Sequence, residues 1–168
     1  MDAVETFNRL PAVGLEDALL ACCAAPSWGA EIVAKRPYRE RADVLRTADA
    51  AARHLTWAEV LTGLSAHPRI GERAGGDSTE AAWSRGEQST AAGTGDDASR
   101  SALVEVNQAY EKKFGHVFLI FASGRTQEEI LAAARQRLGN DEETERAIVT
   151  DELRKIALLR LERVLDAL

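Results

Sequence analysis

Cysteine is almost absent from this chain, and so are long hydrophobic runs. Only Cys22 and Cys23 occur among 168 residues, and adjacent cysteines seldom pair with each other, which excludes a disulfide framework and a thiolate metal cluster. No apolar stretch approaches the roughly 20 residues that span a membrane, and the first ten residues lack the basic region and apolar core of a signal peptide. The last residues are not a peroxisomal address of the Ser-Lys-Leu type. We therefore expect a cytoplasmic protein without a membrane segment.

Basic residues are not in excess either. The formal net charge is -6, which argues against a surface that binds nucleic acid or an anionic membrane. Hydrophobic residues make up 45% and charged residues 29% of the chain, as in ordinary soluble domains. A chain of this length can bury about two thirds of the surface that its unfolded form exposes. We predict one domain over residues 1–168.

Strand-like patterns are scarce, whereas helical ones run along the whole chain. Alanine, leucine, arginine and glutamate dominate, and apolar residues recur at spacings of three and four. The sequence predicts an all-α bundle of about eight to nine helices, with Thr56–Glu59 and Thr126–Glu129 as capping boxes at two helix starts. The expected helices cover residues 2–9, 14–23, 27–35, 40–54, 57–66, 78–90, 98–113, 126–138 and 141–166.

Three connections lie between these helices. Residues 69–77 form a loop, and residues 90–99 a flexible connection rather than a domain boundary, since neither side is able to form a separate core. Residues 117–122, VFLIFA, are the one short extended segment, either a strand or a buried extended stretch.

The histidines are His54, His67 and His116, and no HExxH helix or other ligand spacing accompanies them, so we predict no metal site. The place of His54 at a predicted helix end is enough to explain this histidine without a functional role. His67 ends helix 57–66 because Pro68 disfavours the α conformation in the residue before it. A helix dipole favours an imidazolium there by about 0.3–1 kcal/mol, which suits a general acid near neutral pH. From these residues alone, a plain helix end is the favoured explanation of His67.

The glycines that follow, in GERAGG, do not form a phosphate-binding loop, because the GK[ST] ending and a preceding strand are both missing. We expect them to let the backbone approach another group closely.

Helix 78–90 carries a polar face. Ser84, Glu87 and Gln88 stand at i, i+3 and i+4 and share this face with Glu80. Such a face is usually solvated, but Gly86 in the same helix costs about 1 kcal/mol against alanine and often marks close packing or close approach. The face would make a hydrogen-bonding wall for a small, amide-rich ligand.

Residues 107–125 contain side chains that we expect in the core and a stretch whose backbone groups have no helical hydrogen bonds. Tyr110 and Phe114 are expected in the core. The N–H and C=O groups of the segment 117–122 are free to meet a ligand with urea-like edges, and Arg125 just beyond it can meet a carboxylate.

Three segments, HPRIGE, SRGEQ and NQAYEKKFGHVFLIFASGR, together resemble 2-oxo-4-hydroxy-4-carboxy-5-ureidoimidazoline (OHCU) decarboxylase, the last enzyme of the route from urate to (S)-allantoin. The resemblance extends over nearly the whole chain. It implies an all-α, homodimeric carboxy-lyase that acts on a small molecule without a cofactor, with urate oxidase and hydroxyisourate hydrolase as metabolic neighbours.

The resemblance also implies site residues. His67 matches the family's catalytic histidine and Glu87 its glutamate. The matching substrate-contacting positions are Pro68, Ser84, Arg85, Gly86, Gln88, Phe118, Leu119, Ile120, Phe121, Ala122 and Arg125.

Two short stretches depart from the family pattern. Many members read Gly-Phe-Pro-Phe where this chain has residues 115–118, and His-Pro-Asp where it has His67, Pro68 and Arg69. The first departure leaves two interpretations of His116, which either faces the pocket or is a tolerated structural variant.

The substrate of this family carries its carboxylate next to a ring C=N, which accepts the electrons of the broken C–C bond without a cofactor. We hypothesise that His67 transfers a proton and that Glu87 orients His67 or the substrate. Two other functions remain open at this stage. One is a non-enzymatic ligand-binding module in which His67 and Glu87 form a buried pair, and the other is a metal-dependent hydrolase.

Overall fold

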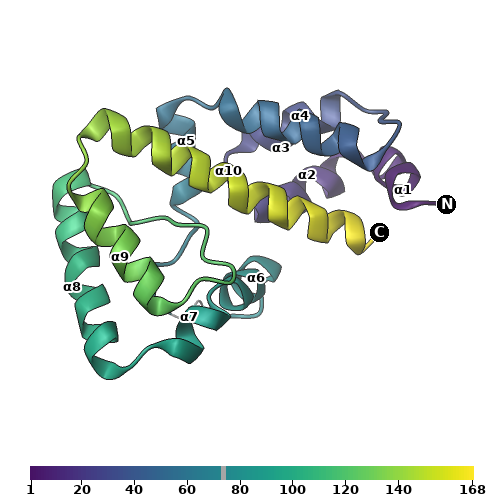
Figure 1. Ribbon diagram of the computed structural model, residues 1–168. Coiled ribbons are helices and arrows are strands. Elements are labelled where there is room, and N and C mark those ends of the chain that lie inside the picture. The colour runs from purple at the N-terminus through teal and green to yellow at the C-terminus, as the bar shows by residue number, and fades with distance from the viewer. Residues whose placement is uncertain (73–74) are drawn as a thin grey trace. The chain divides into compact units, whose positions relative to one another are not determined.

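The computed structural model describes residues 1–72 and 75–168, so Arg73 and Ala74 of the expected loop 69–77 lie outside the described residues. The described part contains ten helices and no strand, which confirms the all-α prediction with one helix more than expected (Figure 1). These helices are α1 (Ala3–Arg9), α2 (Ala12–Cys22), α3 (Pro26–Ala34), α4 (Arg41–Arg53), α5 (Trp57–Leu64), α6 (Thr79–Glu87), α7 (Ser89–Thr94), α8 (Asp97–Phe114), α9 (Gln127–Leu138) and α10 (Glu142–Asp166).

Both predicted capping boxes are confirmed. At the start of α5 the Glu59 N–H donates to Thr56 Oγ1 at 3.2 Å, and the Thr56 N–H donates to the Glu59 carboxylate at 3.1 Å. Thr126 and Glu129 form the same reciprocal pair at the start of α9. Each box satisfies two backbone N–H groups that a helix start leaves unpaired.

Two helix ends were predicted two or more residues too far along the chain. The helix expected over 78–90 ends at Glu87, and α7 begins at Ser89, inside the helix as it was expected. Gln88 has ψ of 3°, away from the helical value, and Ser89 Oγ donates to the Gly86 carbonyl at 2.7 Å, which satisfies a carbonyl freed at the break. Helix α5 ends at Leu64 rather than residue 66, and the chain then turns through the bond from the His67 N–H to the Leu64 carbonyl at 3.0 Å.

The chain divides into two compact units. The first comprises residues 1–63 and 153–168, where α3 packs against α2 and α4. Its core includes Phe7 and Trp28, and the Trp28 indole donates to the Ala48 carbonyl at 3.0 Å. Arg154 of α10 donates to Asp49 of α4 at 2.7 Å, which ties the last helix to this unit.

The second unit, residues 64–152, contains all of the site residues predicted from the sequence. Helices α8 and α9 pack along each other (Figure 1), and the buried side chains around them include Leu103, Tyr110, Phe118 and Ile130. The segment 117–122 is neither helix nor strand, and four of its six side chains are buried. It is therefore the buried extended stretch, not a strand.

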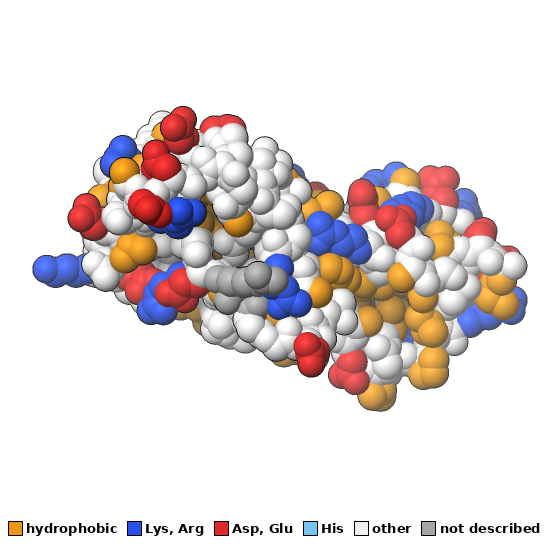
Figure 2. Space-filling model, turned by 90° about the horizontal axis from the view of Figure 1, so that it is seen from below, with side chains coloured by type: hydrophobic (Ala, Val, Ile, Leu, Met, Phe, Trp, Pro, Cys, Tyr) orange, Lys and Arg blue, Asp and Glu red, His pale blue; other side chains and the backbone are white. Residues whose placement is uncertain are grey.

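The surface seen in Figure 2 carries acidic and basic side chains interspersed with one another. No helix among the described residues is both long enough and apolar enough to cross a membrane.

Candidate active site

His67 lies in a tight turn just beyond α5. Its backbone N–H donates to the Leu64 carbonyl at 3.0 Å, and its side chain is half-buried. Together with Pro68 and Ser84 it lines a hollow of about 350 Å³, which Glu80 also borders. The structure thus brings the predicted histidine and the predicted serine of α6 to one cavity.

The loop after Pro68 is held at successive residues by side chains of α8. Arg69 donates to Glu111 of α8 through Nε at 2.6 Å and Nη2 at 3.3 Å. The Ile70 carbonyl accepts a hydrogen bond of 2.8 Å from the buried Asn107 of α8. Such fixed backbone limits the positions open to the preceding histidine.

The backbone of Gly71 lies close to neighbouring groups, as we expected of the glycines in this loop. Its N–H donates to Gln88 Oε1 at 3.1 Å, and its φ is 91°, in the region that favours glycine. A Cβ at this position would lie 3.1 Å from Leu103 Cδ2. The backbone conformation favours glycine here, and a side chain would require Leu103 to shift by a few tenths of an ångström.

The polar face of α6 points inward instead of being solvated. Ser84 is 5% exposed and Glu87 is 7% exposed, although a polar helix face is usually solvated. Gln88 Nε2 contacts Ser84 Oγ at 3.5 Å while its Oε1 accepts from Gly71. Gln88 therefore links the buried face of α6 to the loop that follows His67.

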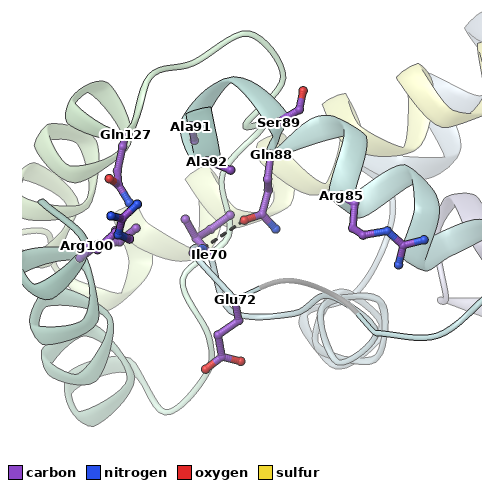
Figure 3. Close-up of a pocket in the computed structure, with 11 residues that line it drawn as sticks. Ile70, Glu72, Arg85, Gln88, Ser89, Ala91, Ala92, Arg100 and Gln127 are labelled. Atoms are coloured by element: carbon purple, nitrogen blue, oxygen red, sulfur yellow. Dashed lines mark hydrogen bonds between the residues drawn. The ribbon is translucent and has the colours of Figure 1, made fainter. Parts of the chain in front are cut away.

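A pocket of about 380 Å³ opens beside Gln88 (Figure 3). Arg100 and Gln127 lie at one side of it and Arg85 at the other, while Gln88 reaches toward the loop at Ile70. A neighbouring hollow of about 370 Å³ shares Arg100 and Gln127. Arginine and amide side chains suit a small polar ligand that carries a carboxylate.

Some backbone groups of the segment 117–122 have no hydrogen-bond partner among the described residues. Carbonyls 119 and 121 accept hydrogen bonds from arginine side chains, and the Ala122 carbonyl accepts from the Arg125 N–H at 3.0 Å. Within the described residues, the N–H groups of 118–122 and the carbonyls of Phe118 and Ile120 have no protein hydrogen-bond partner. The backbone of this segment is thus free only in part, since the carbonyls of residues 119, 121 and 122 are paired.

Arg125 uses one of its guanidinium N–H groups within its own loop. Its Nε donates to the Phe121 carbonyl at 2.9 Å. This bond stabilises the extended segment and leaves the two terminal nitrogens of the guanidinium for another acceptor.

The other two histidines have structural surroundings. His116 lies edge-on to Tyr110 at a centroid distance of 5.5 Å and stacks on Phe114 at 6.2 Å, with Nδ1 3.0 Å from the Val117 carbonyl. It therefore packs against the aromatic side chains of this unit. His54 is the exposed C-cap of α4, in agreement with its place at a predicted helix end.

The predicted residues do not all share one cavity. His67, Pro68 and Ser84 line the first hollow, and Arg85 and Gln88 line the pocket of Figure 3. Gly86 is exposed on α6. Glu87 and residues 118–122 line none of these three hollows.

The sequence did not identify the residues whose hydrogen bonds hold the loop after Pro68 and the extended segment in place, above all Asn107, Glu111 and Arg137. Asn107 had a visible signal, because it is an amide on the otherwise apolar stripe of α8. Among the described residues, no three His, Cys, Asp or Glu side chains are grouped so that they could hold a metal ion.

Comparison with known proteins connects this arrangement to one family. A family model for OHCU decarboxylase matches residues 8–162. A uric acid degradation bifunctional protein of Arabidopsis thaliana is 32% identical over 151 residues, which cover 89% of this chain and 47% of that protein. A 2-oxo-4-hydroxy-4-carboxy-5-ureidoimidazoline decarboxylase of Haloferax volcanii is 32% identical over 163 residues, which cover 94% of this chain and 93% of that protein.

A solved structure agrees with these matches. The crystal structure of an OHCU decarboxylase in the presence of (S)-allantoin superposes with a TM-score of 0.77 at 30% identity, over 89% of this chain and 98% of that one. The chain spans about half the length of its Arabidopsis relative. Since the family model and the Haloferax protein both match it almost from end to end, the chain belongs to the OHCU decarboxylase family.

Proposed function

We propose that this protein decarboxylates OHCU to (S)-allantoin without a cofactor, the last step of urate breakdown. The observation that carries the proposal is the hollow shared by His67 and Ser84, on a loop that three side chains hold in place. The substrate's ring C=N takes up the electron pair as CO₂ leaves, so the protein has to position the substrate and deliver one proton to one face.

His67 is the proton-transfer group in this proposal. It is the titratable side chain of the hollow whose ordinary pKa lies nearest neutrality. The buried Glu87 orients His67 or the hydroxyl and ureido groups of the substrate. Since solution decay has no preferred face, a single proton donor on one side accounts for an optically pure product.

The remaining residues would hold the ring and the ureido tail. Ser84 and Gln88 offer hydroxyl and amide groups, and the unpaired backbone of 118–122 offers both N–H and C=O groups to urea-like edges. Pro68, Arg85, Gly86 and Arg125 complete the proposed contacts, with the guanidinium of Arg125 facing a carboxylate or ring oxygen. We further propose that the chain works as a homodimer, downstream of urate oxidase and hydroxyisourate hydrolase.

The test generates the unstable substrate in situ from urate with those two enzymes and follows circular dichroism of the allantoin formed. Addition of this protein should give a strong (S)-allantoin signal, unchanged by a metal chelator. A racemic product formed at the spontaneous rate would support the non-enzymatic binding module instead. Loss of the signal with chelator would support a metal-dependent enzyme.

A further inference from the structure

A buried ionic cluster lies behind the extended segment, on the side of α8, α9 and the start of α10. The side chains of Arg137 and Glu145 are 7% and 1% exposed, and the arginine donates to Glu145 Oε1 through Nε at 2.8 Å and Nη2 at 2.6 Å. Tyr110 donates its hydroxyl to the same oxygen at 2.6 Å, and Asn140 donates to Oε2 at 3.1 Å. Burial and the neighbouring Glu145 raise the pKa of the Tyr110 hydroxyl, which therefore stays a donor.

Fold stability alone does not explain this cluster. Removing two charges from water is costly, and well-packed apolar side chains of similar volume often replace a buried ion pair without loss. The arginine, however, does something that an apolar side chain cannot do. Its third nitrogen, Nη1, donates to the Leu119 carbonyl at 2.7 Å, and its guanidinium carbon lies 4.5 Å from the centre of the Phe118 ring.

The bond to Leu119 determines which edge of the extended segment is free. In an extended chain, successive backbone groups point to opposite sides, so residues 119 and 121 share one edge. Arg137 occupies this edge at Leu119 and Arg125 occupies it at Phe121. The opposite edge carries the N–H and C=O groups of Ile120, which have no partner among the described residues.

We propose that Arg137 is a positioning residue, which fixes the register of the segment 117–122 so that the backbone edge of Ile120 faces the ligand. The proposal rests on the function proposed above. The guanidinium is held against Phe118 by Glu145, which Tyr110 and Asn140 hold in turn. Only the forked N–H groups of a planar guanidinium can bond Glu145 and the Leu119 carbonyl at the same time in this way.

The test compares Arg137→Lys with Tyr110→Phe. Lysine keeps a positive charge beside Glu145 but loses the fork, while phenylalanine removes one bond to the same carboxylate and leaves the Leu119 contact intact. Both variants should be less stable to urea. At a temperature where both are folded by circular dichroism, Arg137→Lys should lower kcat/KM by about tenfold to a hundredfold, because it misplaces contacting groups, and Tyr110→Phe should not. Equal kcat/KM losses in the two variants would overturn the proposal.

A second readout does not depend on turnover. In ¹⁵N–¹H spectra without substrate, the amide signals of residues 119–121 should shift in Arg137→Lys and stay in place in Tyr110→Phe. Unmoved signals in Arg137→Lys would overturn the positioning role, whatever the activity. Shifted signals together with a wild type that forms no (S)-allantoin would leave the positioning role intact and refute the proposed function.

Discussion

Gly71 provides a sharp test of whether the loop after His67 positions the proposed catalytic group. Its φ of 91° costs an alanine about 1–2 kcal/mol, and a Cβ there lies 3.1 Å from Leu103, which is itself buried. We expect relief of that contact to move the loop away from Gln88 and to cost the hydrogen bond between them, which is worth about 0.5–1.5 kcal/mol. His67 stands only four residues earlier, so Gly71→Ala should reduce activity as well as stability.

The matched control is Gly76→Ala. Gly76 has the same φ of 91°, but a Cβ there has nothing within 4 Å among the described residues. Gly76→Ala should lose about 1–2 kcal/mol of unfolding free energy in urea. Gly71→Ala should lose about 0.5–1.5 kcal/mol more, because it also loses the hydrogen bond to Gln88. Only Gly71→Ala should lower kcat/KM, by about tenfold to a hundredfold, since a 1 Å misplacement of a reacting group has an effect of that order. If both variants keep wild-type kcat/KM, the contacts of Gly71 with Gln88 and Leu103 do not position His67.

Two further substitutions test other parts of the account. A Cβ added at Gly86 of α6 would meet nothing within 4 Å among the described residues, so Gly86→Ala should add about 1 kcal/mol of helix stability. The same methyl group should raise KM if the substrate covers this position, and an unchanged KM in steady-state assays would remove Gly86 from the site. Burial raises the pKa of the Cys23 thiol from 9.0 to about 11. Between these pH values the unfolded thiol ionises and the folded one does not, so stability should fall by about 3 kcal/mol as pH rises. In Cys23→Ala, the unfolding free energy measured with urea should no longer fall in this way between these pH values. If that free energy changes with pH equally in the variant and the wild type, the prediction is wrong.

Local signals in the sequence predicted the helices well. The capping boxes at Thr56 and Thr126 depend on residues three apart, so they are visible in sequence and confirmed in the structure. The break at Gln88 was missed, and the side chain of Gln88 contacts Gly71, 17 residues back, which no local pattern encodes.

The sequence suggested which residue types could form the candidate site, but not the long-range contacts that hold them in place. The polar face of α6 could be read from spacing, but only the structure shows that Ser84 and Glu87 are buried. Asn107 and Glu111 reach the loop after His67 from 37 and 42 residues away. Such contacts depend on how α8 packs, which hydrophobic periodicity alone does not determine.

The most direct test of the central claim is the optical purity of allantoin formed by His67→Asn, with His54→Asn as the control. Asparagine keeps a polar side chain but cannot transfer a proton at neutral pH, and general acid–base catalysis contributes about 10²–10⁴ in rate. His54 is exposed at the end of α4, so its variant should give (S)-allantoin at the wild-type rate. His67→Asn should retain its helix content and give racemic allantoin at the spontaneous rate. Optically pure allantoin formed by His67→Asn at near the wild-type rate would contradict the account.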